Sequence, residues 1–158
     1  MRSLFRVSVL SAALLSCSRQ PDASSFKFPA ARLQTLAGVP GPALSSCPTQ
    51  KCLTVLVAPW CGVCHAVAPD IVKFRRWLDS QGVASRVVVG ASDDLKQIRE
   101  FASEFGSDAM LDPDGNLRAK SVPYFVVSDR EGRVLKTMNG FPRSGGPEDL
   151  ARYLTLLD

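Results

Sequence analysis

Two cysteines and a histidine lie together in the segment WCGVCH, residues 60–65. Cys-x-x-Cys-His is the attachment motif of a c-type haem, in which both cysteines form thioether bonds and the histidine binds the iron. Trp-Cys-x-x-Cys at the junction of a strand and a helix is instead a dithiol motif, in which the two sulfurs form and break a disulfide. The segment therefore predicts electron transfer either on iron or on sulfur. The secondary structure before and after the motif must decide between these two interpretations.

The elements around the motif favour sulfur. Residues 54–58, TVLVA, are a short β-branched run that is typical of a strand buried on both faces. After the motif, apolar residues recur at helical spacing until a glycine: Val67, Ile71, Phe74, Leu78 and then Gly82. A c-type cytochrome of this size is expected to be helical, and the candidate axial ligands Met110 and Met138 lie in strand-like segments. We therefore interpret the motif as a dithiol, with haem as the less favoured alternative.

The N-terminus of a helix suits a reactive thiol. Its unpaired N–H groups and partial positive charge favour an anion, so Cys61 is expected to be stabilised there as the thiolate. Lowering a thiol pKa from ~8.5 to ~7 takes only about 2 kcal/mol, which a helix end can supply. Cys64 lies one turn further and can bond to Cys61. A static disulfide and half of a zinc site are the alternatives, although zinc needs two further ligands and His65 is the sole histidine of the chain.

His65 follows Cys61 by four residues and can lie on the same face of the predicted helix. As an imidazolium it would favour the thiolate and so tune the pKa of Cys61. A solvated helix residue without such a role is the simpler interpretation, and both remain open at this point.

The remaining pattern predicts an α/β fold. The further elements are three strands and two helices, at residues 86–91, 124–129, 133–138, 92–106 and 147–157. Ser92 is expected to cap the first of these helices, and Pro147 to open the second. LDPDGN at 111–116 and REG at 130–132 are turn signals. The order is βαβα followed by ββα, which predicts a central mixed β-sheet flanked by helices.

Three features together resemble the thioredoxin superfamily. APWCGVC resembles the family's active-site segment, Pro69 falls where the family kinks its active-site helix, and SVPYFVV resembles the segment with the family's cis-proline. The longer run LDPDGNLRAKSVPYFVVSDREGRVL resembles the TlpA-like branch of exported, membrane-tethered thiol–disulfide oxidoreductases. The resemblance implies a thioredoxin-like fold with a helix–strand insertion before the cis-proline, which would be Pro123. It also implies that Trp60, Val122 and Pro123 support the site and line the substrate groove.

The resemblance further implies an enzyme without a cofactor. Cys61 would attack a disulfide as the thiolate and Cys64 would resolve the mixed disulfide. Protein dithiols or disulfides of the envelope would be the substrates, and a membrane reductant or oxidant would reset the pair. Val55 and Val67 occupy positions at which relatives carry a carboxylate, and Gly-Val replaces the Gly-Pro usual in thioredoxins. The proton acceptor for Cys64 and the direction of electron flow are therefore not assigned. A non-catalytic binding module with a structural disulfide is the alternative function.

Cys47 and Cys52, in CPTQKC, form a second pair. Their proximity, together with export, favours a disulfide that clasps the start of the first buried strand. Closing so short a loop would contribute about 2 kcal/mol. A redox pair that relays electrons to the motif, or two free thiols, are the alternatives.

The N-terminus resembles an export signal. Residues 1–16 contain two arginines and a short apolar run, and LLSC ends like a bacterial lipoprotein signal peptide, so acylation is predicted at Cys17. The run is too short to cross a bilayer, and an ordinary cleaved signal is the alternative. Residues 17–46, rich in Pro, Gly, Ser and Ala, are predicted as a flexible tether with a short helix near residues 30–36. Residues 47–158 are predicted as the thioredoxin-like domain.

These features place the protein, as an expectation, in the bacterial cell envelope, held by a lipid anchor and facing the periplasm. The sequence does not indicate which membrane holds it. The net charge is +4 and no run of Lys and Arg occurs, which argues against a nucleic-acid partner.

Overall fold

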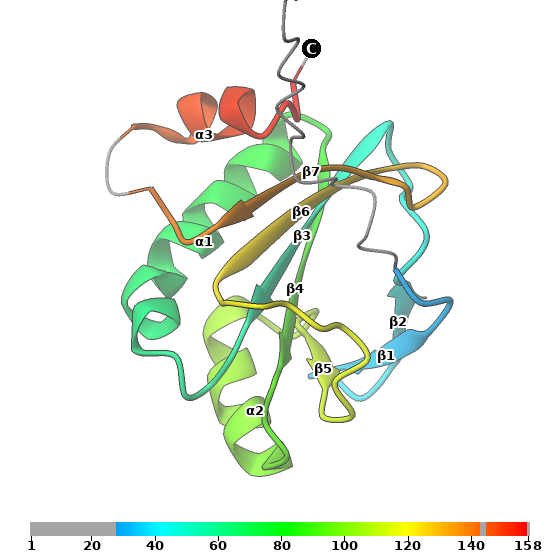
Figure 1. Ribbon diagram of the computed structural model, residues 1–158, viewed down its shortest axis with the longest axis vertical. Coiled ribbons are helices and arrows are strands. Elements are labelled where there is room, and N and C mark those ends of the chain that lie inside the picture. Colours follow the sequence, from blue (N-terminus) through cyan, green and yellow to red (C-terminus); the bar gives the residue numbers. More distant parts are fainter. Residues whose placement is uncertain (1–27, 143–144, 158) are drawn as a thin grey trace, which may run out of the picture.

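The computed structural model describes residues 28–142 and 145–157, and these form one mixed β-sheet with helices (Figure 1). The strands are β1 Arg32–Thr35, β2 Pro40–Ala43, β3 Lys51–Val57, β4 Ala84–Gly90, β5 Met110–Asp112, β6 Tyr124–Asp129 and β7 Val134–Asn139. The helices are α1 Gly62–Ser80, α2 Leu95–Ala102, the short 3₁₀ helix η2 Ser103–Phe105, and α3 Pro147–Tyr153. The order across the sheet is β2-β1-β5-β4-β3-β6-β7. The predicted α/β class with a mixed central sheet is confirmed.

Strand β3 is central in the sheet and leads directly into the motif. It runs parallel to β4 and antiparallel to β6. Every residue of β3 after the first is buried, as expected for a strand covered on both faces. Leu53, Val55 and Val57 belong to the hydrophobic cluster on the helical face, whereas Leu56 belongs to the cluster on the opposite face. The chain then passes through a short loop into α1, so the strand–helix junction predicted for the motif is present.

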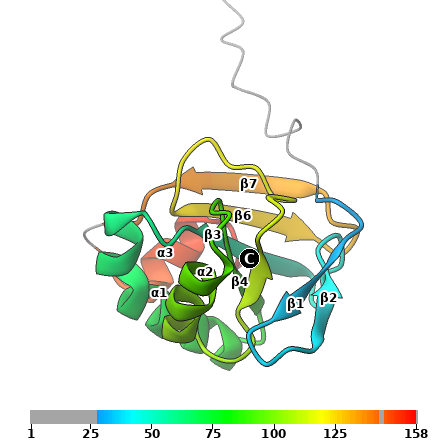
Figure 2. The same cartoon turned by 90° about the horizontal axis from the view of Figure 1, so that it is seen from below.

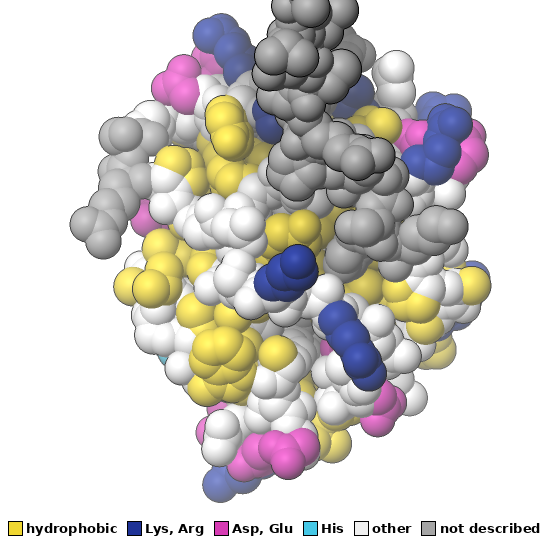
Figure 3. Space-filling model, in the orientation of Figure 1, with side chains coloured by type: hydrophobic (Ala, Val, Ile, Leu, Met, Phe, Trp, Pro, Cys, Tyr) yellow, Lys and Arg dark blue, Asp and Glu magenta, His cyan; other side chains and the backbone are white. Residues whose placement is uncertain are grey.

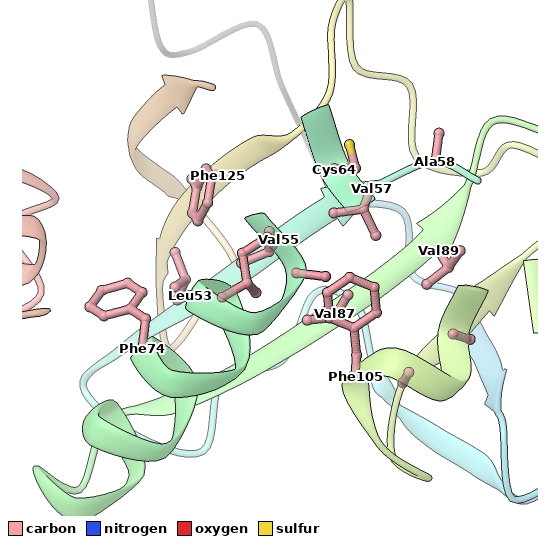
Figure 4. Packing of buried hydrophobic residues seen from close by; sticks show 14 of the residues in the cluster. Leu53, Val55, Val57, Ala58, Cys64, Phe74, Val87, Val89, Phe105 and Phe125 are labelled. Atoms are coloured by element: carbon pink, nitrogen blue, oxygen red, sulfur yellow. The ribbon is translucent and has the colours of Figure 1, made fainter. Parts of the chain in front are cut away.

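Helices α1, α2 and α3 pack on the same face of the sheet. Their buried side chains share one hydrophobic cluster with the strands, and Ile71, Phe74, Ile98 and Leu154 are among its members. Figure 4 shows part of this cluster, with the ring of Phe74 near Leu53 of β3. Figure 2 shows the helices grouped together, with β1 and β2 at the end of the sheet far from β7. This packing fixes the first turn of α1 against the end of β3.

The prediction of a flexible tether over residues 17–46 is wrong for its described part. Residues 32–35 and 40–43 are strands rather than tether or helix, and β1 pairs antiparallel with β5. The residues of β1 alternate between exposed and buried, which is the period of a strand. The prolines of β2 are tolerated because β2 is an edge strand, where a missing N–H leaves no ladder bond unmade. The expected signal peptide and residues 17–27 lie outside the described residues.

Residues 28–46, the N-terminal segment of the described chain, also contribute to the core. Phe28, Leu33 and Leu44 are buried in a second cluster, on the face of the sheet opposite the helices. Leu117, from the loop between β5 and β6, belongs to the same cluster. The folded domain therefore begins at or before Phe28 and not at residue 47.

The segment between the motif and Pro123 contains α2 and β5, the helix–strand insertion that the resemblance implies. α2 begins two residues later than predicted. Its N-cap is Asp94, whose carboxylate accepts the N–H groups of Lys96 and Gln97. Ser92 instead accepts the N–H of Asp94 and belongs to the preceding turn.

Candidate redox site

Cys61 is the N-cap residue of α1. Its backbone is extended, with φ −88° and ψ 99°, and its Sγ accepts the N–H of Cys64 at 3.1 Å. The two cysteines form a disulfide, with a Cα–Cα distance of 5.2 Å. The sulfur of Cys61 thus lies where the unpaired N–H groups and the positive end of the helix dipole favour a thiolate. The Cys-x-x-Cys spacing produces this arrangement because three residues span almost one helical turn.

The two sulfurs differ in their access to solvent. Cys61 is 7% exposed and Cys64 is fully buried, at 0%. Figure 4 shows Cys64 beside Val57, at the end of β3. Only the first cysteine of the motif can therefore be reached from outside without a movement of the chain.

Three of the residues predicted to support the site lie around it. The Val122–Pro123 peptide bond is cis, and the carbonyl oxygen of Val122 lies 3.5 Å from Sγ of Cys61. The indole Nε1 of Trp60 donates a hydrogen bond to the carbonyl of Ala91, while 64% of the residue remains exposed. Figure 3 shows hydrophobic side chains gathered near the start of α1 and the loop before it. The rim of the site therefore combines an exposed aromatic side chain with the backbone before the cis-proline.

His65 lies at the first turn of α1 and contacts three other segments. Its Nε2 is 2.8 Å from the carbonyl oxygen of Pro59, and its Nδ1 is 3.2 Å from Oε1 of Glu104. Its ring packs against Phe101 of α2, with 4.1 Å between the ring centroids. The side chain is 46% exposed and is at the same time held by these contacts. Glu104 was not predicted as part of the site, because an exposed glutamate 39 residues away carries no sequence signal.

The motif residues do not fit a haem or a zinc ion. The sulfurs of Cys61 and Cys64 are bonded to each other, and both ring nitrogens of His65 face protein oxygens. Within residues 28–142 and 145–157, no group of three or more His, Cys, Asp and Glu side chains could hold a metal. Met110 and Met138 lie in β5 and β7, as their strand-like surroundings predicted.

A buried carboxylate near the motif could accept the proton of the Cys64 thiol. Val55, where thioredoxins bury a carboxylate, is fully buried in the helical-face cluster. Asp112 is the one buried carboxylate of the described residues. Its oxygens accept the backbone N–H groups of Asn116 and Leu117, and it lines a small cavity with Leu56. Leu56 belongs to the hydrophobic cluster on the face of the sheet opposite α1, whereas Val57 and Val122, which line the same cavity, lie next to the site.

Cys47 and Cys52 form the second disulfide, with a Cα–Cα distance of 5.6 Å. Cys52 lies at the start of β3, whereas the motif follows its end. A strand of this length spans about 20 Å, so the two disulfides lie at opposite ends of β3. This separation argues against direct exchange between the two pairs.

Comparison with known proteins gives a family match and several similar structures. The model of the Redoxin family matches residues 23–158. The exposed lipoprotein thioredoxin Etrx1 of Streptococcus pneumoniae has a TM-score of 0.64 and 21% identity, over 80% of this chain and 98% of that chain. A secreted Mycobacterium tuberculosis disulfide oxidoreductase homologous to E. coli DsbE has a TM-score of 0.61 and 19% identity, over 81% of this chain and 96% of that chain. StoA from Bacillus subtilis has a TM-score of 0.57 and 19% identity, over 79% and 98%.

At these identities the similar structures establish the fold alone. No curated protein sequence matches the chain significantly. None of the helices in the described part of the chain has the length and apolar character needed to cross a bilayer.

Proposed function

The chain belongs to the Redoxin family and is a thiol–disulfide oxidoreductase with a thioredoxin-like fold, and from this premise we propose that Cys61 and Cys64 are its redox pair. The observation that carries the proposal is the asymmetry between the two sulfurs. Cys61 caps a helix and retains some exposure, whereas Cys64 is fully buried behind it. A nucleophile must be ionised and reachable, and a resolving thiol must be shielded until a mixed disulfide forms beside it.

The reaction proceeds in two exchanges. The Cys61 thiolate attacks one sulfur of a substrate disulfide, a new S–S bond forms, and the other substrate sulfur leaves as a thiolate that takes up a proton. Cys64 then loses its proton and attacks the sulfur of Cys61. The Cys61–Cys64 bond closes, and the second substrate sulfur leaves as a thiolate that takes up a proton. The substrate gains two electrons and two protons and the enzyme is oxidised; the reverse sequence oxidises dithiols.

The rim of the site is the proposed substrate groove. A segment that brings its sulfur to Cys61 passes over Trp60 and over the backbone of Val122 and Pro123, since the Val122 carbonyl is 3.5 Å from Sγ of Cys61. Protein dithiols or disulfides of the envelope are the proposed partners, and a membrane reductant or oxidant resets the pair. The Cys47–Cys52 disulfide is proposed to be structural.

Trapping tests the division of labour between the two cysteines. The reduced protein is alkylated across pH, and mixed disulfides with envelope extracts are sought in a Cys64→Ser variant, with Cys61→Ser as the matched control. We expect Cys61 to be labelled rapidly below pH 8 and mixed disulfides to accumulate only in Cys64→Ser. If Cys61 reacts no faster than a free thiol and nothing is trapped, the protein is a binding module and the Cys61–Cys64 bond is a structural staple.

We also propose that the protein is exported and lipid-anchored at Cys17, with residues 1–16 as the signal peptide. Two of the similar structures are described as an exposed lipoprotein and as a secreted protein, which supports export. Labelled fatty acid should enter the full-length protein and not a Cys17→Ser variant. Equal labelling of the two would exclude acylation at that cysteine.

A further inference from the structure

The ring of His65 is held between two oxygen atoms that accept hydrogen bonds. A carbonyl oxygen cannot donate, so the 2.8 Å contact with Pro59 requires a proton on Nε2. A carboxylate oxygen cannot donate either, so the 3.2 Å contact with Glu104 requires a proton on Nδ1. A neutral imidazole has one N–H group and the imidazolium has two. Only the protonated ring satisfies both contacts, and the Glu104 carboxylate then forms an ion pair with it.

We propose that His65, held by Glu104, places a positive charge beside the Cys61 thiolate and so raises the reactivity of Cys61 and the reduction potential of the redox pair. The inference rests on the proposed role of Cys61. Cys61 is the residue that reacts. His65 is a positioning residue that affects Cys61 by its charge, and Glu104 affects Cys61 by holding His65.

The fold keeps the backbone of His65 one helical turn from Cys61. The backbone N–H of His65 donates to the carbonyl of Cys61 at 3.2 Å, and positions four apart on a helix have Cβ atoms about 5–6 Å apart. The bond to Pro59 turns the ring back toward the loop that precedes the thiol. The groups that the structure places against the ring are the Glu104 carboxylate from η2, the apolar ring of Phe101 from α2 and the carbonyl of Pro59.

The charge favours one redox state over the other. The thiolate exists only in the reduced enzyme, and the disulfide carries no charge. A cation near Cys61 therefore stabilises the reduced form and makes the pair a stronger oxidant. This stabilisation requires the two N–H groups that the contacts with Pro59 and Glu104 engage. The Glu104 charge offsets part of the field at Cys61 but accepts the second N–H of the charged ring, so its removal is expected to lower the reactivity near neutral pH.

Four variants separate these contributions. His65→Gln removes the charge, His65→Lys keeps a charge that does not titrate below pH 9, and Glu104→Gln removes the partner of the ring. Glu100→Gln is the matched control, because Glu100 is an exposed acid on the neighbouring helix α2 and pairs with Lys96 at 3.8 Å. The rate of Cys61 alkylation by iodoacetamide is measured from pH 5 to pH 10, with the labelled residue identified by mass spectrometry.

We expect His65→Gln to be alkylated about three- to tenfold more slowly than the wild type at pH 6, with equal rates above pH 9, where the thiol is ionised in both proteins. His65→Lys should keep the wild-type rate at pH 6, Glu104→Gln should be slower at pH 7, and Glu100→Gln should be unchanged. In equilibrium with glutathione, His65→Gln should favour the disulfide by at most the same factor, which corresponds to a potential at most about 15–30 mV more negative.

The failure of this inference differs from the failure of the proposed function. If wild-type Cys61 reacts rapidly and His65→Gln reacts equally fast at pH 6, the charge on His65 has no effect and the inference is wrong. A Glu104→Gln variant that reacts faster than the wild type would also overturn it, because Glu104 would then act only as a repelling charge. If wild-type Cys61 itself reacts like a free thiol, the proposed function fails, and the inference fails with it.

Discussion

Arg86 of β4 binds the N-terminal segment to the face of the sheet opposite the helices. Its side chain is 8% exposed, and its guanidinium donates to the hydroxyl of Thr54 on β3 and to three backbone carbonyls: those of Ala43, Leu44 and Ser46. It also lies over the ring of Phe28, 5.2 Å from the centroid. We predict that Arg86→Leu lowers the free energy of unfolding by about 3 kcal/mol, although leucine is the better residue for a buried site on hydrophobicity alone.

The magnitude is the difference between two opposing contributions. Burial lowers the pKa of Arg86 to about 10. At about 1.36 kcal/mol per pKa unit, the charged side chain is disfavoured there by about 3 kcal/mol, which leucine would recover. Against this, the variant leaves a hydroxyl and three carbonyls without their donor. An unpaired buried acceptor costs about 1–3 kcal/mol, so the four acceptors together cost about 6 kcal/mol if each costs about 1.5 kcal/mol. The difference between this cost and the gain from leucine is the predicted loss of about 3 kcal/mol.

Urea unfolding with both disulfides intact measures this loss. The matched control is Arg152→Leu on α3, which removes an exposed arginine paired with Glu148 and should change stability by less than about 1 kcal/mol. If Arg86→Leu costs no more than the control, apolar packing and not the guanidinium holds the N-terminal segment. The measured difference would then refute the assignment of its hydrogen bonds as the dominant contribution.

Three further predictions rest on other contacts. Gly132→Ala should destabilise the protein by at least about 2 kcal/mol in the same urea titration, because φ is +74° and a Cβ would lie 2.5 Å from a backbone oxygen. Gly38→Ala is the control and should cost about 1 kcal/mol, because φ is +81° but no atom lies within 4 Å of the added Cβ. Replacing both Cys47 and Cys52 by serine should cost about 2 kcal/mol of stability and leave the rate at which the motif disulfide is reduced unchanged; slower reduction would revive the relay hypothesis. Trp60→Ala should slow the reduction of a protein disulfide such as that of insulin. Because the side chain is 64% exposed, the free energy of unfolding should change by no more than about 1 kcal/mol. An unaltered rate of reduction would show that Trp60 does not contribute to the substrate groove.

The central part of the fold could be predicted from the sequence because its signals are local. The run of β3 and the apolar period of α1 are each complete within one segment, and the cis-proline at Pro123 follows from a motif of a few residues. These elements contain both motif cysteines and the backbone of Val122. Most of the candidate site could therefore be placed before the structure was known, although the structure alone gives the difference in burial between the two sulfurs.

The features that could not be predicted depend on contacts distant in sequence. β1 and β2 have four residues each, and PGPA has no strand propensity of its own. They form strands because β5 offers an unpaired edge, and because Arg86 and the second hydrophobic cluster bind the segment. The pairing of His65 with Glu104 depends in the same way on the packing of α2 and η2 against α1. A pattern along one segment contains no information on such a partner.

The two disulfides show that location in the fold, and not the presence of two neighbouring cysteines, decides what a pair can do. Cys47 and Cys52 are 7% and 3% exposed, and Cys61 is no more exposed than Cys47, so burial does not separate the pairs. The difference lies in the local backbone. Cys52 is the second residue of a strand, where neighbouring peptide dipoles largely cancel, whereas Cys61 caps a helix and accepts an N–H of its first turn. A thiolate is therefore stabilised at the end of β3 and not at its start, and since exchange requires a thiolate, the rapid chemistry is confined to the motif.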